Sequence, residues 1–339
     1  MIKKHLLVLG AGSVGKRHLY NFSSLGCEVS IMDPRSDRVE EAAKIVSPVH
    51  RFANMQDAIA HSSEFSGLVV CSPPKFHVDQ AIAFLERDVP VLLEKPVSPD
   101  LSSALLLKEA VQKTNVPLLL GYTYRWWPPL IEMKKRILDI GAIRHARFMM
   151  SAHLADWHPW ERYQDFFMAS RELGGGALLD ESHFIDLMIW FFGMPKTISG
   201  RVERLSHLEI ETDDNVDLLC AYENNLRVTI HLDLYGRPHE KSITSVGEKG
   251  TLQCLFDPNS LRHAQDATGK WDVTPFSCDR NDMFVAEAKE FLEIIENRIQ
   301  PSSTIADGID VLRCIEAARQ STSQERAIRL SEVGRREEC

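Results

Sequence analysis

Cysteine is scarce in this sequence and is never closely paired. Seven cysteines occur in 339 residues, and no two of them are spaced as C-x-x-C. This spacing lacks the usual zinc-ligand and redox-dithiol motifs, and an odd number of scattered cysteines does not suggest a disulfide framework. Buried, reduced thiols in a cytoplasmic protein are the simplest interpretation. We therefore expect no metal site and a cytoplasmic location.

Long apolar runs and excess positive charge are also missing. Runs such as Asp186–Met194 are far shorter than the about 20 residues that a membrane span needs. Thirty-nine Lys and Arg face 48 Asp and Glu, a net charge of -9 that disfavours binding to a phosphate backbone. Met1–Lys4 and the apolar run after it resemble a signal peptide, but that run leads directly into the glycines at positions 10 and 12. We expect neither a membrane nor a nucleic-acid partner.

The first third of the chain alternates short apolar runs with amphipathic stretches. Such alternation predicts parallel strands covered by helices on both faces of a sheet. The predicted strands are His5–Leu9, Glu28–Met32, Leu68–Cys71, Val91–Leu93 and Pro117–Leu120. The predicted helices are Val14–Leu25, Arg38–Ile45, His77–Arg87 and Leu101–Thr114. A doubly wound α/β domain over residues 1–123 follows from this pattern.

Beyond residue 123 the strands are longer and closely spaced, which predicts an α+β domain with a mainly antiparallel sheet over residues 124–339. Asn224 and Asn225 suit a tight hairpin turn between two of these strands. The predicted strands are Arg144–Leu154, Ile198–Leu205, Val216–Tyr222, Arg227–Leu234 and Ile243–Leu255, and the predicted late helices are Phe284–Ile299 and Ile305–Arg319.

The first motif with chemical meaning is G-x-G-x-x-G at the end of the first predicted strand. Gly10 permits a tight turn, Gly12 lets backbone amides approach a pyrophosphate, and Gly15 lets the helix sit close to the strand. Val14 begins the predicted helix and Ser13 precedes it, and both are assigned to cofactor binding because the helix N-terminus favours phosphate. The motif predicts a dinucleotide site.

An acid follows the motif at the expected distance. Asp33 ends the second predicted strand, where its carboxylate would accept hydrogen bonds from ribose hydroxyls and repel a 2′-phosphate. Arg35 lies close enough to offset part of that repulsion. We therefore predict NAD as the cofactor, with NADP possible, and assign Asp33 and Arg35 to its binding.

Two further motifs carry candidate acid–base groups. Glu94 and Lys95 follow the strand Val91–Leu93, at the sheet edge where ligands of parallel sheets bind, so Lys95 is a candidate catalytic group. A triple glycine at 174–176 precedes a predicted helix Leu178–Phe192, on which Asp180, His183 and Asp186 would share one face. An acid beside a histidine can orient its imidazole, so Asp180 and His183 are candidate catalytic and substrate-binding residues.

Aromatic residues near these motifs suggest a sugar platform. Trp157, Trp160 and Tyr163 offer flat faces to the C–H surfaces of a sugar, and Arg162 could pair with an anionic substituent. Core packing and a solvated loop charge are the alternative interpretations of these residues.

Together these motifs resemble the Gfo/Idh/MocA family of NAD(P)-dependent oxidoreductases over almost the whole chain. Gly10–His18 is similar to its G-x-G-x-x-G-x-x-H, and the family's D-x-x-x-H is shortened here to Asp180-x-x-His183. The resemblance implies that Ser72, Pro73 and His77 form a loop over the cofactor and that Glu94 and Arg125 also contact it. It further implies that Lys95 is the catalytic lysine, that Tyr124 contacts substrate, and that the last helices pack back on the Rossmann domain.

The resemblance implies a sugar, polyol or sugar derivative as substrate and a homodimer or homotetramer as the assembly. The favoured function is hydride transfer between the nicotinamide and a hydroxyl-bearing carbon. A redox-neutral, NAD-dependent glycoside hydrolase needs nearly the same residues and stays open. A non-enzymatic nucleotide or sugar sensor is the third possibility, although the presence of Lys95 and His183 argues against it.

Overall fold

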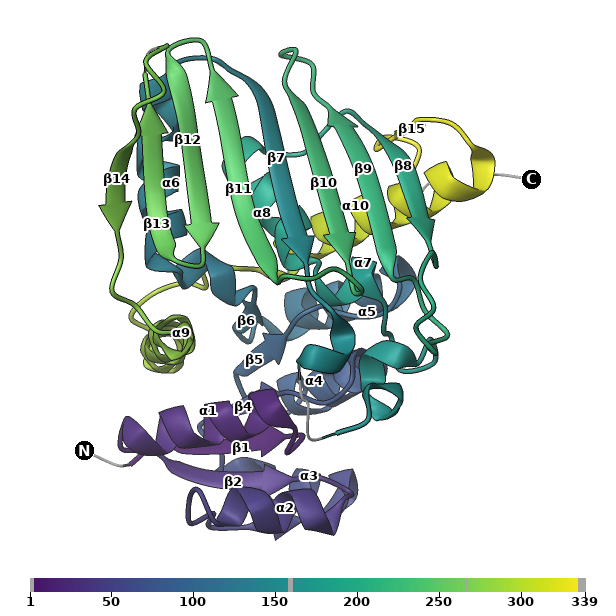
Figure 1. Cartoon of the computed structure of the whole chain (residues 1–339). Helices are drawn as coiled ribbons and strands as arrows, with labels where there is room; N and C mark the ends of the chain where they lie inside the picture. The colour runs from purple at the N-terminus through teal and green to yellow at the C-terminus, as the bar shows by residue number, and fades with distance from the viewer. Residues whose placement is uncertain (1–2, 158–160, 266, 335–339) are drawn as a thin grey trace. The chain divides into compact units, whose positions relative to one another are not determined.

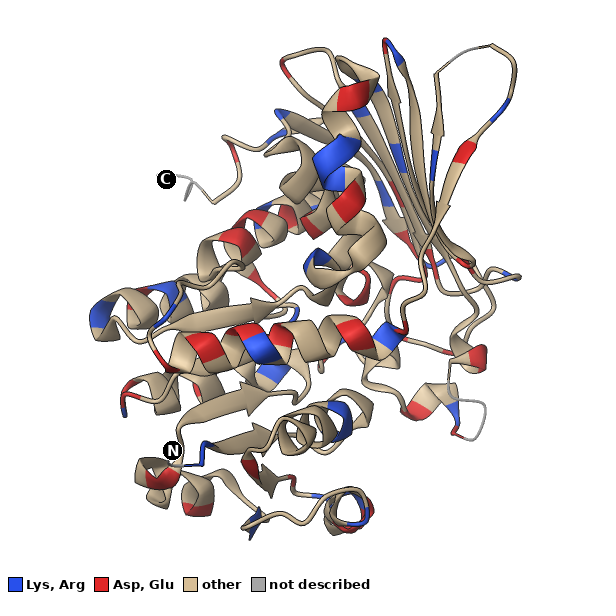
Figure 2. Cartoon of the chain, turned by 90° about the vertical axis from the view of Figure 1, so that its left-hand side faces the viewer, with Lys and Arg blue, Asp and Glu red and all other residues tan. Residues whose placement is uncertain are grey.

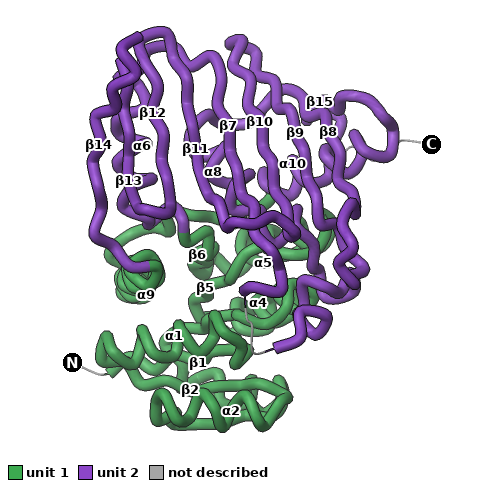
Figure 3. Tube along the Cα trace, viewed as in Figure 1, with its two compact units in different colours: residues 1–123, 280–309 green, residues 124–279, 310–339 purple. Residues whose placement is uncertain are grey.

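The computed structural model describes residues 3–157, 161–265 and 267–334. The chain divides into two compact units (Figure 3). The first unit contains residues 1–123 and 280–309, and the second contains residues 124–279 and 310–339. The first unit is therefore assembled from two segments that lie far apart in the sequence.

The first unit contains a six-stranded sheet with the order β3-β2-β1-β4-β5-β6 (Figure 1). All neighbouring strands are parallel, as the apolar runs predict. Successive strands are added on one side of β1 up to β3 and on its other side from β4 onward, and doubly wound sheets bind ligands at such a switch point. The strands are β1 His5–Leu9, β2 Glu28–Met32, β3 Arg51–Phe52, β4 Gly67–Val70, β5 Val91–Glu94 and β6 Leu118–Gly121.

Helices connect and cover these strands. Asp100 caps the longest connecting helix by accepting a hydrogen bond from the Ser103 amide at 2.9 Å, and Asn115 ends it in the left-handed region. The helices of this unit are α1 Ser13–Ser24, α2 Ser36–Ala43, α3 Met55–Ala60, α4 His77–Leu85, α5 Leu101–Thr114 and α9 Arg280–Ile295. Of these, α9 packs against α1.

The second unit contains a nine-stranded sheet with the order β14-β13-β12-β11-β7-β10-β9-β8-β15. Its pairs are antiparallel except β7 with β10, so the predicted mainly antiparallel sheet is confirmed. The strands are β7 Ile143–Ser151, β8 Thr197–Glu203, β9 Asn215–Ala221, β10 Arg227–Asp233, β11 Glu240–Gly247, β12 Gly250–Phe256, β13 Asn259–Ala264, β14 Asp272–Pro275 and β15 Ile328–Arg329.

One predicted strand of this sheet is wrong. The stretch Ile243–Leu255 forms two strands, β11 and β12, joined by a turn at Glu248 and Lys249. Gly247 and Gly250 flank that turn, and a side chain at Gly247 would lie 2.2 Å from the Ile140 carbonyl oxygen. The predicted hairpin turn between β9 and β10 is confirmed, with Asn225 in the left-handed region.

Three α-helices cover one face of the nine-stranded sheet (Figure 1): α6 Pro128–Arg136, α8 His183–Phe192 and α10 Ile305–Gln324. The opposite face carries no helix among the described residues, so the sheet is open-faced. Acidic and basic residues are interspersed along the helices rather than segregated on separate elements (Figure 2). Within the described range, no helix combines the length and apolarity that crossing a bilayer requires.

The predicted helix Leu178–Phe192 is also wrong, because it is interrupted. Residues Ala177–Asp180 form the short helix α7, and α8 begins only at His183. The amide of Ser182 lies 3.4 Å from the Leu179 carbonyl oxygen, whereas the regular helical bonding resumes at Asp186. Asp180, His183 and Asp186 therefore do not share the face of one continuous helix.

Candidate functional site

The glycine motif joins β1 to α1 and has the properties of a phosphate cradle. Gly10 adopts a φ of +94°, and a side chain at Gly15 would lie 1.8 Å from the Gly10 carbonyl oxygen. A side chain at Gly12, in contrast, would meet no atom within 4 Å. Gly12 precedes the first turn of α1 and no side chain caps that turn, so its amides suit an anion.

Asp33 holds this loop from the end of β2. Its carboxylate accepts hydrogen bonds from the Ala11 amide at 2.7 Å and from the Arg35 amide at 2.9 Å. Each carboxylate oxygen can accept more than one hydrogen bond, so these contacts leave capacity for a ribose hydroxyl. The Arg35 guanidinium lies 2.5 Å from Asp37, and this pair holds the pKa of Asp37 below its ordinary value.

The loop after β4 is tied to the segment after β5 by one histidine. His77 is buried, with Nε2 at 2.7 Å from the Ser72 carbonyl oxygen and Nδ1 at 2.8 Å from that of Pro96. Burial is the main cause that lowers the pKa of His77. Ser72 also donates a hydrogen bond to Gln80 at 2.6 Å. The imidazole thus links the loop that begins with Ser72 and Pro73 to the segment that carries Lys95.

Lys95 directly follows β5 and is partly exposed. Leu9 of β1 pairs with Val70 of β4, and Val70 pairs with Leu93 of β5. The carboxyl ends of these three strands therefore lie side by side. The glycine loop, the Ser72 loop and Lys95 leave the sheet at this one edge, where doubly wound sheets bind their ligands.

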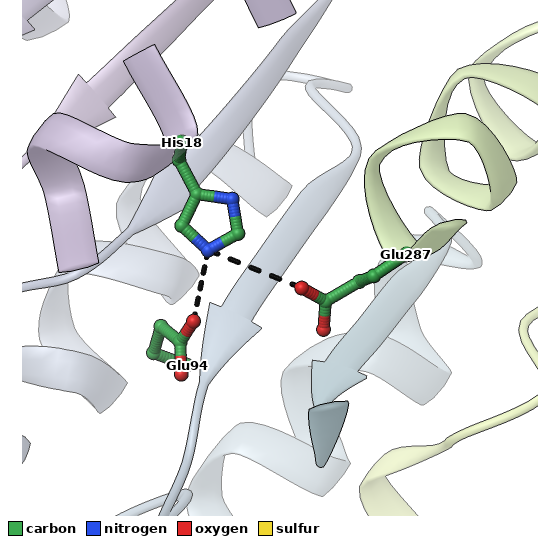
Figure 4. Close-up of side chains that lie close together, drawn as sticks. All are labelled: His18, Glu94 and Glu287. Atoms are coloured by element: carbon green, nitrogen blue, oxygen red, sulfur yellow. Dashed lines mark hydrogen bonds and ion pairs between the residues drawn. The ribbon is translucent and has the colours of Figure 1, made fainter. Parts of the chain in front are cut away.

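Beside Lys95, a buried cluster joins three elements of the first unit (Figure 4). His18 of α1 lies with Nε2 at 2.8 Å from Glu94 Oε1 and at 3.9 Å from Glu287 Oε2. His18 and Glu287 are fully buried, and Glu94 nearly so. The sequence marked His18 and Glu94 through their motifs, whereas Glu287 was missed. Its one signal is an acid on the apolar stripe of α9, next to Phe284, Ala288 and Phe291.

In the second unit, the triple glycine shapes the approach to α7. Gly174 and Gly176 adopt φ values of +84° and +109°. A side chain at Gly176 would lie 2.4 Å from Asp213, whose carboxylate accepts a hydrogen bond from the Leu178 amide at 2.8 Å. Burial raises the pKa of Asp213. The glycines therefore let an acid reach the N-terminus of α7, which ends at Asp180.

His183 begins α8 and lies against an aromatic ring. The ring centroids of His183 and Tyr124 are 4.5 Å apart. The Tyr124 hydroxyl accepts a hydrogen bond from Lys241 of β11 at 2.9 Å, and Lys241 lies 3.5 Å from Glu181. Lys241 was missed by the sequence analysis because nothing in its strand pattern marks it, and Glu181 was passed over within its motif. These residues give the His183 region a cation that the motifs do not contain.

Arg125 is buried in an ion pair, whereas Trp157 and Arg162 of the predicted substrate platform are at least partly exposed. Arg125 makes a buried, two-pronged ion pair with Asp186 at 3.0 and 2.6 Å. Trp157 is partly exposed, and Arg162 is exposed. The Tyr163 hydroxyl accepts a hydrogen bond from the Glu209 amide at 3.3 Å. Trp160 lies outside the described residues.

Comparison with known proteins decides the family. Residues 4–122 match the family described as "Oxidoreductase family, NAD-binding Rossmann fold", and residues 132–253 match the "GFO/IDH/MocA C-terminal domain". The chain belongs to the Gfo/Idh/MocA family. The resemblance inferred from its motifs is thereby confirmed.

Several curated proteins resemble this chain in sequence. The inositol 2-dehydrogenase of Corynebacterium glutamicum (strain R) is 31% identical over 134 residues, which are 38% of this chain and 40% of that protein. The chain thus spans well under half of that relative's length in the match. The rhizopine catabolism protein MocA of Rhizobium meliloti is 26% identical over 96% of this chain and 97% of that protein. The NADP(+)-dependent scyllo-inositol 2-dehydrogenase IolU of Bacillus subtilis is 23% identical over 84% and 86%.

Solved structures of low sequence identity share the Gfo/Idh/MocA fold. Levoglucosan dehydrogenase in complex with NADH and levoglucosan superposes with a TM-score of 0.86 at 17% identity, over 97% of this chain and 99% of that one. An oxidoreductase from Agrobacterium radiobacter, in complex with NAD+, L-tartaric acid and magnesium, superposes with a TM-score of 0.82 at 16% identity over the same shares. These likenesses establish the fold.

Proposed function

We propose that this chain is an NAD-dependent dehydrogenase that moves a hydride between the nicotinamide and a hydroxyl-bearing carbon of a sugar, polyol or sugar derivative. The observation that carries the proposal is the position of Lys95. It leaves the sheet of the first unit at the same edge as the glycine loop and the Ser72 loop. The names of the relatives, inositol dehydrogenases among them, support the substrate class.

The residues of the first unit fit a dinucleotide. Gly12 leaves open space before the uncapped first turn of α1, and the Gly15 position permits no side chain. Asp33 stands at the end of β2, where its charge favours NAD over NADP. Bound NAD+ supplies the hydride acceptor. The predicted contacts of Ser13, Val14 and Arg35 with it belong to this proposal.

Proton transfer falls to side chains of the chain itself. Either Lys95 or His183 takes the proton of the substrate hydroxyl, and the other stabilises the alkoxide as it forms. Asp180 supports His183, and Tyr124 contacts the substrate. The loop residues Trp157, Trp160, Arg162 and Tyr163 complete the substrate contacts that we propose.

Assembly and location complete the proposal. The helix-free face of the nine-stranded sheet suits contact between copies of the chain, as a homodimer or homotetramer. Cys27, Cys71, Cys220, Cys254 and Cys314 form no disulfide, consistent with the cytoplasm.

The direct test is a substrate panel read at the NADH absorbance. Inositols, aldoses, anhydrosugars and their acids would be offered with NAD+ and, separately, with NADP+. Turnover with at least one polyol or sugar, and faster with NAD+, is expected. Binding of NAD+ without turnover on the whole panel would contradict the proposal, as would release of nitrophenol from a glycoside without net NADH.

Replacing Gly12 by alanine is expected to weaken NAD+ binding without loss of stability. The new methyl group meets no protein atom but occupies the space before α1 through which the pyrophosphate must approach. Calorimetric titration should show a Kd raised by at least about tenfold, equivalent to about 1.4 kcal/mol. The melting temperature without nucleotide should equal that of the wild type. An unchanged Kd would place the nucleotide elsewhere.

Replacing His183 by asparagine is expected to lower kcat by about a hundredfold or more. Asparagine fills part of the same space, but its side chain cannot act as an acid or a base near neutral pH. The measurement is kcat against pH for the best substrate of the panel. The exposed His207 offers the control, since His207→Asn should leave the profile intact. Equal turnover in both variants would remove His183 from the mechanism.

A further inference from the structure

Glu287 is an acid in an unusual position. It lies on α9, is fully buried, and neither of its carboxylate oxygens has a hydrogen-bond partner among the described residues. In Figure 4 it points at His18, whose Nε2 is 3.9 Å from its Oε2. The same Nε2 already makes a 2.8 Å hydrogen bond to Glu94. Two carboxyl groups therefore compete for one ring nitrogen.

The charges around Glu287 disfavour a second carboxylate there. Burial raises its pKa well above the ordinary value, and the negative charges of Glu94 and Glu290 raise it further. Burial is the main cause that raises the pKa of the neighbouring Cys71 thiol, and the negative charge of Glu94 adds to it. Burial is the main cause that lowers the pKa of Arg17, while the negative charge of Glu94 raises it. The Arg17 guanidinium donates a 3.3 Å hydrogen bond to Asn281.

The guanidinium groups on these helices do not compensate Glu287. The guanidinium carbon of Arg17 lies 4.9 Å from the centroid of the Phe284 ring. After burial, the positive charge of Arg280 is the next cause that lowers the pKa of Arg17. In the described part of the chain, His18 is the one basic side chain within ion-pair distance of Glu287. The ring nitrogen of His18 that faces Glu287 already makes its hydrogen bond to Glu94. A proton on Glu287 itself is then the remaining way to neutralise a carboxylate that is removed from water.

A metal ion is the alternative that the cluster invites, since one ligand atom of each residue lies within 4.8 Å of the others. The separation of His18 Nε2 and Glu94 Oε1, however, is 2.8 Å, which is the length of a hydrogen bond. Two ligands held at about 2.0–2.1 Å around one tetrahedral ion lie farther apart than this. The geometry therefore favours a hydrogen bond between His18 and Glu94 over a cation bound to both.

We propose that Glu287 works as an uncharged carboxylic acid, so that Glu94 alone bears the negative charge and keeps its hydrogen bond to His18. Glu94 ends β5 and Lys95 follows it, while His18 belongs to the helix whose first turn follows the glycine loop. The cluster thus fixes the segment of Lys95 to that helix. Glu287 and His18 are positioning residues, and this part of the inference rests on the proposed role of Lys95.

The first test measures stability against pH and needs no substrate. A neutral acid in the fold holds a proton that the unfolded chain releases above about pH 4.3. The unfolding free energy of the wild type should therefore fall, relative to Glu287→Gln, as pH rises from about 5. The folding equilibrium constant should change about tenfold per pH unit until Glu287 ionises. Glu293→Gln, on the exposed side of α9, is the control and should follow the wild type.

The second test asks whether the cluster positions Lys95. Glu94→Gln removes the charge that holds His18, so kcat should fall while KM changes little. In the wild type, ionisation of Glu287 at alkaline pH should disturb the hydrogen bond between Glu94 and His18 and lower kcat. In Glu287→Gln this fall of kcat should move to higher pH, because no second carboxylate forms beside Glu94. A merely structural defect would lower the amount of folded enzyme without moving this pH profile.

Clear outcomes overturn the inference. If the stabilities of Glu287→Gln and Glu293→Gln change with pH in the same way, Glu287 is ionised in the fold. A stoichiometric metal in the purified wild type that is lost in Glu287→Gln would assign the cluster to a cation. If the proposed dehydrogenase activity is itself absent, the stability difference still decides the protonation of Glu287, so the two failures are distinguishable.

Discussion

Lys95→Met should lower kcat by a factor of about 10²–10⁴ while NAD+ still binds, because methionine keeps the length of the side chain and loses its exchangeable proton. Lys95→Arg separates charge from proton transfer. A guanidinium keeps the positive charge but does not release a proton near neutral pH. If Lys95 is an acid–base group, the arginine variant is as slow as the methionine variant.

The measurement is a single-turnover reaction of substrate with saturating NAD+, which isolates hydride transfer from product release. Lys113→Met, at the exposed end of α5, serves as the control for loss of one ammonium group. Near wild-type rates for Lys95→Met would exclude this lysine from the chemistry. Recovery in Lys95→Arg would reduce its role to that of a fixed charge.

Arg125→Met should destabilise the second unit by about 3–5 kcal/mol. The variant deprives Asp186 of the guanidinium that grips it at 2.6 and 3.0 Å, and the Asp186 side chain is only 1% exposed. A carboxylate that cannot reach water loses far more than the energy of one contact. Urea unfolding, followed by circular dichroism, measures the difference.

The chain offers a matched control for this ion pair. Arg237 grips Asp156 in the same two-pronged manner, at 2.7 and 2.9 Å, but both side chains are more than half exposed. Arg237→Met should therefore cost at most about 1 kcal/mol. Similar losses for the two variants would mean that burial does not set the strength of the Arg125–Asp186 pair. Replacing Arg125 and Asp186 together by apolar residues should recover much of the loss.

The parallel sheet could be predicted because its signal is local. His5–Leu9 is apolar in sequence and buried throughout, and a glycine follows it directly. The strands β13 and β14 gave no such signal, because Asn259–Ala264 and Asp272–Pro275 neither alternate nor run apolar. β13 forms along the edge of β12, and β14 forms along the edge of β13, so both strands have a tertiary cause.

The candidate site was predictable only as far as its motifs reach. The glycine loop follows β1, Asp33 follows β2 and Lys95 follows β5, so each motif lies at the end of a parallel strand. Lys241 and Glu287 enter their clusters from elements far along the chain, so no spacing marks them. The prediction that Asp180 and His183 share one helix face was wrong, because the chain is interrupted between α7, which ends at Asp180, and α8, which begins at His183. The apolar composition of this stretch gives no sign of that interruption.

The discontinuous build of the first unit has a consequence for biosynthesis. The Leu120 amide of its edge strand donates a hydrogen bond to the Ser303 carbonyl oxygen at 3.0 Å, and Gly308 fits closely against Val97 and Leu120. Residues 280–309 leave the ribosome long after residue 123. The nascent residues 1–123 therefore lack the contacts of residues 280–309 while the second sheet is synthesised. Chaperones have their longest opportunity to bind this incomplete unit during that interval.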